Sequence, residues 1–289
     1  MSEAIAYLNG QYLPLAETRV SVLDRGFLFA DGIYEVAAVL DGRLIDNDAH
    51  LARMARSAGE LGIALPITLD EVAAVQAELV RRNAMDGGLV YVQLTRGTEA
   101  GRDFLPAEDT PPTLVMFVQH KALIDVPAAR SGIRVRTMPD LRWARRDIKS
   151  TALLAQVLAK REAAAAGCQE AWMVEDGLVT EGASSTAFIL TAEDVLVTRP
   201  DSHAVLPGCT GAAVRALAAE QGIGLERRAF SVAEALAAKE AFITSASTFV
   251  LPVVEIDGQA VGGGTPGPVA GRLRELYIAV ARGVGASCR

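Results

Sequence analysis

Apolar and polar residues alternate along several short stretches of the first half of the chain, a period of two that is typical of β-strands. Two apolar runs flank Asn9-Gly10, a pair that fits a type I′ turn, so residues 6–13 are predicted to form a hairpin. Further strands are expected over 34–40, 43–45, 88–97 and 112–118, and two amphipathic helices over 46–61 and 69–85. Residues 98–111 form a polar loop, long enough to be functional.

The second half continues with short elements. Residues 121–131, which contain Pro127, are predicted to be an interdomain linker. The expected elements are a strand over 132–138, a helix over 151–162 that ends at Gly167, a hairpin over 171–180, strands over 187–190 and 195–198, a helix that residues 206–211 open and that runs to 220, a strand from 241 into a hydroxyl-rich turn at 245–248, a hairpin at Asp257-Gly258 and a helix over 268–282.

Lys149 lies between the predicted strand over 132–138 and the predicted helix from 151. Ser150 or Thr151 is expected to cap that helix, so the positive end of its dipole would lie near the lysine and disfavour the ammonium form. Arg145 and Arg146 are expected to add to this effect, which favours an amine able to attack a carbonyl group. A surface lysine at a helix start is the alternative interpretation.

Composition narrows the class of protein. The 289 residues suffice for one large or two ordinary domains. No run of about 18 apolar residues and no basic-then-apolar leader is present, which argues against a membrane span or export, and the cytoplasm is expected. The net charge of −7, with the signs interspersed, argues against a nucleic-acid-binding face and favours small-molecule partners.

The cysteines and histidines argue against several other types of structural and catalytic site. The cysteines are few and far apart, which indicates reduced thiols rather than disulfides or a metal site: Cys168, Cys209 and Cys288. The chain has neither a His-Glu-x-x-His motif nor a Gly-x-Ser-x-Gly elbow, so zinc and serine hydrolysis are disfavoured and no metal site is expected.

One ligand would use the remaining polar features together. It would carry a carbonyl group for Lys149, a phosphate for Arg53 and the amides and hydroxyls around Thr210, and a ring nitrogen for a carboxylate such as Glu181. Pyridoxal 5′-phosphate has all three groups. A glutamate against its pyridine nitrogen keeps that nitrogen protonated, so the ring acts as an electron sink.

Along nearly its whole length the chain resembles the class IV aminotransferases, which are fold-type IV pyridoxal-phosphate enzymes, and among them it is most similar to D-amino-acid transaminases. The matching motifs are Tyr7-Leu-Asn-Gly10, Asp24-Arg-Gly26, Asp31-Gly-Ile-Tyr-Glu35, His50 with Arg53, Thr95-Arg-Gly97, Asp147-Ile-Lys-Ser150, Thr180-Glu-Gly182, Leu206-Pro-Gly208 with Thr210, and Pro252 to Asp257. Their number and order carry the resemblance.

The resemblance implies a mixed fold (α/β, α+β) of two domains. A smaller N-terminal α/β domain would span 1–120, and after the linker at 121–131 a larger C-terminal domain of pseudo-barrel type would span 132–289 and bind the cofactor. It also implies a homodimer whose active sites are completed by the neighbouring subunit.

The resemblance further implies roles for single residues. Lys149 would bind the cofactor covalently and carry the proton between substrate and cofactor. Arg53 would hold the phosphate together with Cys209, Thr210, Ser245, Ala246 and Ser247. Glu181 would pair with the ring nitrogen, Leu206 would pack under the ring, and Tyr34 would line the substrate pocket.

The chain departs from the family pattern in one loop. D-amino-acid transaminases typically carry an Arg-x-His pair after Thr-Arg-Gly, and here Gly101 and Asp103 occupy those two positions. A charged clamp on the substrate carboxylate is therefore missing or rebuilt. The candidate replacements, in order of preference, are Arg96, Arg102 and Arg25.

The expected activity is transfer of an amino group from a D-amino acid, such as D-alanine or D-glutamate, to a 2-oxo acid such as 2-oxoglutarate. A branched-chain L-amino-acid transaminase, an (R)-amine transaminase and a 4-amino-4-deoxychorismate lyase are alternatives that keep the cofactor. A cofactor-free binding or scaffold protein of the same fold is the alternative from another class.

Overall fold

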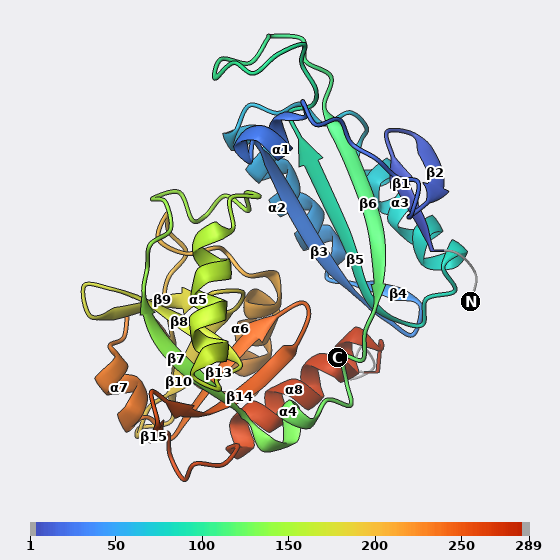
Figure 1. The fold of residues 1–289 in the computed structure, drawn as a ribbon. Helices are drawn as coiled ribbons and strands as arrows, with labels where there is room; N and C mark the ends of the chain where they lie inside the picture. The colour runs from blue at the N-terminus through green and yellow to red at the C-terminus, as the bar shows by residue number, and fades with distance from the viewer. Residues whose placement is uncertain (1–3, 285–289) are drawn as a thin grey trace. The chain divides into compact units, whose positions relative to one another are not determined.

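The computed structural model describes residues 4–284, and the contacts of the chain divide it into two units (Figure 1). The first unit comprises the residues up to Ala122 together with Ile148–Ala152. The second comprises Leu123–Asp147 and the residues from Leu153 onwards. The short segment around Lys149 thus belongs, by its contacts, to the first unit.

Antiparallel strands and two amphipathic helices build the first unit. Over residues 4–122 the sheet has six strands in the order β2 (Gln11–Pro14), β1 (Ile5–Leu8), β6 (Thr113–His120), β5 (Gly87–Thr95), β3 (Gly32–Leu40) and β4 (Arg43–Ile45). The helices are α1 (Arg25–Phe29), α2 (Asn47–Glu60) and α3 (Leu69–Arg82). The hairpin at Asn9-Gly10 is confirmed, with φ of 45° and 93°, as a type I′ turn requires.

The core of this unit is formed by the apolar stripes of α2 and α3 and inward-facing side chains of the sheet, among them Met54, Leu79 and Val92. Helix α2 also buries three polar side chains: His50, Arg53 and Ser57. Their burial follows from polar partners on β3 and near Lys149, described below, because a buried polar group needs a hydrogen-bond partner.

A larger, mixed sheet forms the second unit. Over the described residues its strands lie in the order β12 (Gly224–Arg227), β11 (Val195–Thr198), β10 (Thr186–Leu190), β13 (Glu240–Ser245), β14 (Phe249–Ile256), β7 (Ile133–Pro139), β8 (Glu170–Glu175) and β9 (Leu178–Gly182), with β15 (Gln259–Ala260) paired to β14. Its helices are α4 (Pro127–Ser131), α5 (Leu154–Ala165), α6 (Cys209–Glu220), α7 (Val232–Ala237) and α8 (Pro268–Ala281).

Aromatic side chains fill part of the core of the second unit. Phe188 on β10 and Phe242 on β13 are paired across neighbouring strands, and their rings stack with centroids 4.9 Å apart. Trp172 and Phe230 meet edge-on at 6.1 Å. All four side chains are almost completely buried, and the pair of Phe188 and Phe242 joins β10 to β13, the strand that ends at Ser245.

The expectation about the helix after Lys149 is wrong. Helix α5 begins at Leu154, and its first turn receives no side-chain cap. Ser150 instead forms a β-bridge with Ile33, and Thr151 donates its backbone N–H to the carbonyl of Gly32 at 3.0 Å. These backbone groups are used to extend the pairing of β3, so they are not available to start a helix, and Lys149 does not lie at a helix N-terminus.

Other elements differ from the sequence prediction. The motif Asp24-Arg-Gly26 forms the start of α1, a helix that was not predicted, and the Asp24 side chain accepts from the N–H of Gly26 at 2.8 Å. The predicted linker includes α4, and β12 and α7 were not predicted. Arg145 and Arg146 are paired with Asp147 and Glu175, so their charges are balanced by carboxylates.

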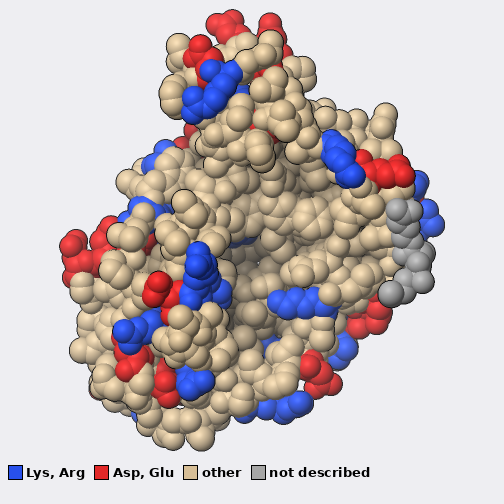
Figure 2. All heavy atoms as spheres, viewed as in Figure 1, with Lys and Arg blue, Asp and Glu red and all other residues tan. Residues whose placement is uncertain are grey.

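Surface and thiol features complete the description. Acidic and basic side chains are interspersed on the face drawn in Figure 2, without a continuous basic stripe among its described residues. Cys168 and Cys209 are free thiols, as expected, whereas Cys288 lies outside the described residues. Between residues 4 and 284, no helix combines the length and apolar character needed to cross a membrane.

Candidate active site

The backbone of Lys149 is fixed from two sides within the first unit. Its carbonyl accepts from the N–H of Tyr34 on β3 at 3.0 Å, and its own N–H donates to the Ser57 hydroxyl on α2 at 3.3 Å. The ammonium nitrogen lies 4.3 Å from the centroid of the Tyr34 ring. The structure therefore brings together Lys149 and Tyr34, which the sequence analysis assigned to catalysis and to the substrate pocket.

Arg53 lies on α2 one turn before Ser57, on the same helix face. Its Nε and Nη2 donate to the two carboxylate oxygens of Glu35 at 2.7 and 2.8 Å, and His50 Nδ1 lies 2.8 Å from the same carboxylate. Burial by itself would raise the pKa of Glu35, but the charge of Arg53 and the hydrogen bonds from Arg53 and His50 outweigh it and lower that pKa to about 2, with a smaller contribution from the charge of Lys149. Glu35 is therefore ionised and holds the guanidinium in one orientation.

The sequence analysis assigned Glu35 no role, although a signal was present. Along β3, Ile33, Glu35 and Ala37 face inward by alternation, and all three are buried. A carboxylate in an inward position must have a buried partner, and a helix with His50 and Arg53 at i, i+3 spacing follows in the sequence.

Glu181 lies on β9 in the second unit and is also buried. Its carboxylate oxygens accept from the N–H of Leu206 at 3.1 and 3.2 Å, and one of them contacts Nη1 of Arg142. Burial raises the pKa of Glu181, and the charge and hydrogen bond of Arg142 oppose that effect. Arg142 and its further partner Asp140 were missed, because a short Asp-x-Arg sequence in a loop is more often solvated than buried.

The start of α6 follows Leu206 by three residues. Gly208 precedes the helix without giving a side-chain cap, so the first amides of α6 keep the unsatisfied donors of a helix N-terminus. A Cβ on Gly211 would lie 3.2 Å from the hydroxyl of Thr244, the residue just before Ser245. The first turn of α6 therefore packs against the end of β13, and the two segments predicted to bind phosphate lie together.

Hydroxyl groups gather where these segments meet. Ser245 Oγ lies 2.7 Å from Thr248 Oγ1 and 3.3 Å from Ser247 Oγ, while Ala246 contributes only backbone. The buried hydroxyls of Thr210 and Thr244 have no hydrogen-bond partner among the described residues. Because a buried hydroxyl without a partner is costly, both groups point to a ligand with acceptor oxygens.

These residues fit the predicted cofactor. A phosphate would satisfy the two threonine hydroxyls and the amides at the start of α6. Glu181, joined to the same segment through Leu206, supplies a carboxylate for the ring nitrogen. Lys149 would supply an amine for the aldehyde.

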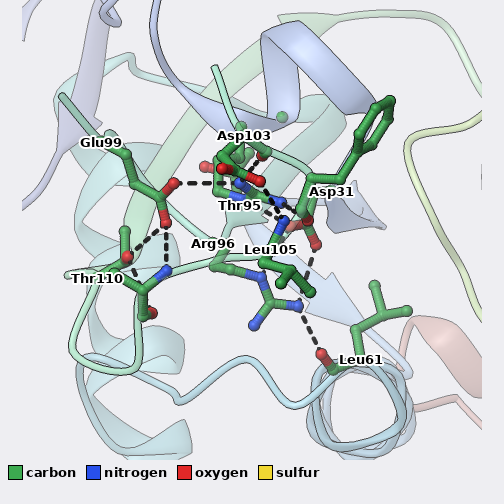
Figure 3. A network of polar contacts seen from close by, with 12 residues as sticks. Asp31, Leu61, Thr95, Arg96, Glu99, Asp103, Leu105 and Thr110 are labelled. Carbon is green, nitrogen blue, oxygen red and sulfur yellow. Dashed lines mark hydrogen bonds and ion pairs between the residues drawn. The ribbon is translucent and has the colours of Figure 1, made fainter. Parts of the chain in front are cut away.

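Two of the three arginines proposed for the substrate carboxylate have carboxylate partners within the first unit. Figure 3 shows Arg96 between Asp31 and the carbonyl of Leu61, which it binds at 2.7 Å. Arg25 is buried and binds Asp31 at 2.9 Å and Glu99 at 3.1 Å. Arg102 is exposed and lies over the rings of Phe29 and Phe104, with no ion pair among the described residues.

The chain matches known proteins over most of its length. A family model described as amino-transferase class IV matches residues 32–256. A D-alanine aminotransferase from Bacillus licheniformis is 38% identical over 262 residues, which cover 90% of this chain and 91% of that protein. A D-alanine aminotransferase from Staphylococcus haemolyticus is 35% identical over 273 residues, 94% of this chain and 95% of that protein.

A solved structure agrees with these relatives. The pyridoxal-phosphate-bound form of a hypothetical aminotransferase from Mycobacterium tuberculosis has a TM-score of 0.84 and 25% identity, covering 96% of this chain and 99% of that one. The mixed α/β fold with one smaller and one larger sheet is confirmed. The chain belongs to the class IV aminotransferases, the pyridoxal-phosphate-dependent transaminases of fold type IV.

Proposed function

We propose that this protein is a D-amino-acid transaminase that moves the amino group of D-alanine or D-glutamate to a 2-oxo acid such as 2-oxoglutarate. One structural observation carries the assignment of the site. Glu181 is bonded to Leu206, and three residues later α6 begins beside two buried threonine hydroxyls that lack a partner among the described residues. The proposed ring-binding acid is therefore hydrogen-bonded to the short segment that leads into the proposed phosphate-binding helix start. The choice of D-amino acids rests on the relatives named D-alanine aminotransferase.

Each site residue has a task in this reaction. Bound pyridoxal phosphate supplies the electron sink that accepts the electron pair left behind when the substrate loses its α-proton. Lys149 binds the cofactor through Nζ and moves that proton, and Tyr34, against whose ring the ammonium lies, borders the substrate. Glu35 orients Arg53, which would bind the phosphate. In the second unit, the α6 amides and the hydroxyls of Thr210 and Ser245 would bind it.

Arg102 becomes the first candidate for the substrate carboxylate. Arg25 and Arg96 are both bound to Asp31, and a new anion would have to compete with that carboxylate. Arg102 has only ring contacts, on a loop whose residues line a hollow of about 760 Å³. This reverses the order of Arg96 and Arg102 expected from the sequence.

A substrate panel tests the activity against its alternatives. Purified protein is incubated with 2-oxoglutarate and, separately, D-alanine, L-leucine or an (R)-arylamine, and the products are resolved on a chiral column; 4-amino-4-deoxychorismate is assayed for pyruvate release. We expect turnover with D-alanine. Faster turnover of L-leucine or of the arylamine would contradict the proposal, as would pyruvate release from the lyase substrate.

Lys149→Ala tests the central residue in the same assay. The variant should bind the cofactor only reversibly, show the absorbance of the free aldehyde in place of that of the lysine-bound cofactor, and lose turnover by several orders of magnitude. Lys160→Ala serves as a control, because Lys160 is partly exposed and bonded to the carbonyl of Gln169 and to Glu170. Wild-type turnover by Lys149→Ala would contradict the assignment.

We further propose that the protein acts in the cytoplasm as a homodimer whose active sites are completed by the neighbouring subunit. Each unit exposes large apolar side chains that a second copy would cover: Phe104 and Leu105 in the first, Leu154, Val157 and Leu158 on α5 in the second. Light scattering coupled to size exclusion should give twice the 30.4 kDa mass of the chain. A monomer at micromolar concentration would contradict this part of the proposal.

A further inference from the structure

Five charged side chains of alternating sign form a continuous ion-pair network in the second unit, with Glu181 at one end. Arg142 contacts Glu181 and binds Asp140 at 2.7 Å. Arg146 lies 3.5 Å from Asp140 and binds Glu175 at 2.6 and 2.9 Å. The Glu175 side chain is 41% exposed, whereas the other four are at most 6% exposed. The ion-pair network therefore extends from Glu175 at the solvent to the buried carboxylate of Glu181.

Asp140 lies at the centre of this ion-pair network. Its side chain is fully buried and accepts from Arg142 Nε at 3.0 Å and from Arg142 Nη2 at 2.7 Å. The backbone N–H of Arg142 and the hydroxyl of Thr180 also donate to it, at 3.1 and 2.7 Å. Asp140 thus occupies one whole edge of the guanidinium, and Nη1, on the opposite side, is the nitrogen directed at Glu181.

This geometry limits how Arg142 can bind Glu181. A guanidinium and a carboxylate that meet without competition form a forked pair with two N–H···O bonds. Asp140 already uses the Nε–Nη2 edge, so Arg142 presents Nη1 to a single oxygen of Glu181. Arg142 favours the ionised form of Glu181 against the effect of burial, and acceptor capacity is left on the carboxylate for another donor.

The charges of this network also bear on Glu181. Its four buried side chains carry two negative and two positive charges, and Glu175 adds a third carboxylate at the solvent end. Burial raises the pKa of Glu181, while burial of Asp140 is outweighed by its bonds from Arg142, which lower the pKa of Asp140. A protonated ring nitrogen placed against Glu181 would, like Arg142, favour the ionised form of this carboxylate.

We propose that Asp140 is a positioning residue: by holding Arg142 along one edge, it keeps Glu181 an oriented anion that selects a cofactor whose ring nitrogen carries a proton. The inference rests on the proposed pyridoxal-phosphate site and adds a residue that does not itself touch the cofactor. Asp140 acts through Arg142, and Arg142 acts on Glu181.

The test compares two cofactors on Asp140→Asn. Apoprotein is titrated with pyridoxal 5′-phosphate and with its deaza analogue, in which a C–H replaces the ring nitrogen, and both dissociation constants are measured by fluorescence quenching. Wild type should prefer the natural cofactor, because only that cofactor can donate to Glu181. Asp140→Asn should lose about tenfold or more of this preference, since a charge-assisted bond is weakened for one ligand only. Asp140→Glu should restore part of it.

Glu240→Gln is the matched control for the loss of a buried carboxylate. Glu240 lies in the same unit and binds the backbone N–H groups of Val269 and Ala270 at the start of α8, both at 2.9 Å. This variant should unfold at a lower temperature but keep the wild-type preference between the two cofactors. The melting temperature of each apoprotein separates loss of folding from loss of selectivity.

The outcomes distinguish the inference from the function on which it rests. If wild type prefers the natural cofactor and Asp140→Asn weakens binding of both cofactors by the same factor, Asp140 has only a structural role and the inference is wrong. If Asp140→Asn keeps the full preference, the inference is wrong as well. If wild type binds neither cofactor, the proposed function is wrong, and so is the inference that rests on it.

Discussion

Glu35 binds the guanidinium of Arg53 through two hydrogen bonds of 2.7 and 2.8 Å, and both side chains are buried. A buried arginine without a carboxylate would be strongly destabilising. With Glu35 it becomes a fixed cation on α2, the helix that also binds the backbone of Lys149 through Ser57. The pair therefore serves both the fold of the first unit and the proposed phosphate contact.

Replacement of Glu35 should change how stability depends on pH. The pKa of Glu35 is lowered from 4.5 to about 2, so its ionised form stabilises the folded state above pH ~4.5, and this contribution is lost as the pH falls towards ~2. It amounts to on the order of 3 kcal/mol. Glu35→Gln should be less stable than wild type near neutral pH and lose less stability on acidification. Urea unfolding at a series of pH values measures both.

Glu78→Gln provides the control for this experiment. Glu78 binds Arg81 and Arg82 on the surface of α3, and its pKa is also lowered to about 2, chiefly by hydrogen bonds from these arginines. Solvent screens such pairs, so the acid dependence of unfolding should stay close to that of wild type. An equal flattening in both variants would show that burial of Glu35 is not the cause.

Thr244→Val should separate apoprotein stability from cofactor affinity. The Thr244 hydroxyl is buried and lacks a partner among the described residues, so its removal should leave the melting temperature of the apoprotein unchanged or higher. The affinity for pyridoxal phosphate should fall about tenfold, because one hydrogen bond to the phosphate is lost. Equilibrium dialysis and thermal unfolding give the two values.

Thr198→Val is the matched comparison. Thr198 is equally buried, but its hydroxyl donates to the carbonyl of Ala187 at 2.9 Å. This variant should lose about 1 kcal/mol of stability and keep its cofactor affinity. If Thr244→Val destabilised the apoprotein as much as Thr198→Val and left the affinity intact, the Thr244 hydroxyl would not be a phosphate ligand.

Arg25 should hold the loop over residues 98–110 in one conformation. Besides Asp31 and Glu99, it binds the carbonyls of Asp103 and Phe104 at 2.7 and 2.9 Å. Arg25→Met removes these bonds and leaves two carboxylates without their buried cation, so we expect a loss of about 3 kcal/mol and faster amide exchange in the loop. Hydrogen exchange followed by mass spectrometry measures the rates.

Arg102→Met is the control on the same loop. Its guanidinium contacts only aromatic rings and has no ion pair among the described residues, so exchange in the loop should hardly change. Protection in Arg25→Met equal to that of wild type would show that the backbone of the loop holds its own shape.

The local order of elements followed from the sequence, since periodicity and turn chemistry are properties of neighbouring residues. The hairpin at Asn9-Gly10, the amphipathic α2 and α3, and the end of α6 at Glu220 all agree with the prediction. The family and cofactor also followed, from motifs spread along the chain. The roles of Lys149, Arg53 and Glu181, and the domain limits, stay predictions.

Only the tertiary structure decided which polar groups are paired. Ser150 and Thr151 had the residue types of a helix cap, but pairing with β3 used their backbone groups and moved the start of α5 to Leu154. Glu35 and Asp140 looked like ordinary charges in the sequence, and burial made each the anchor of an arginine. Hydrogen bonds and ion pairs join residues far apart in the chain, and their strength depends on burial, which no local pattern specifies.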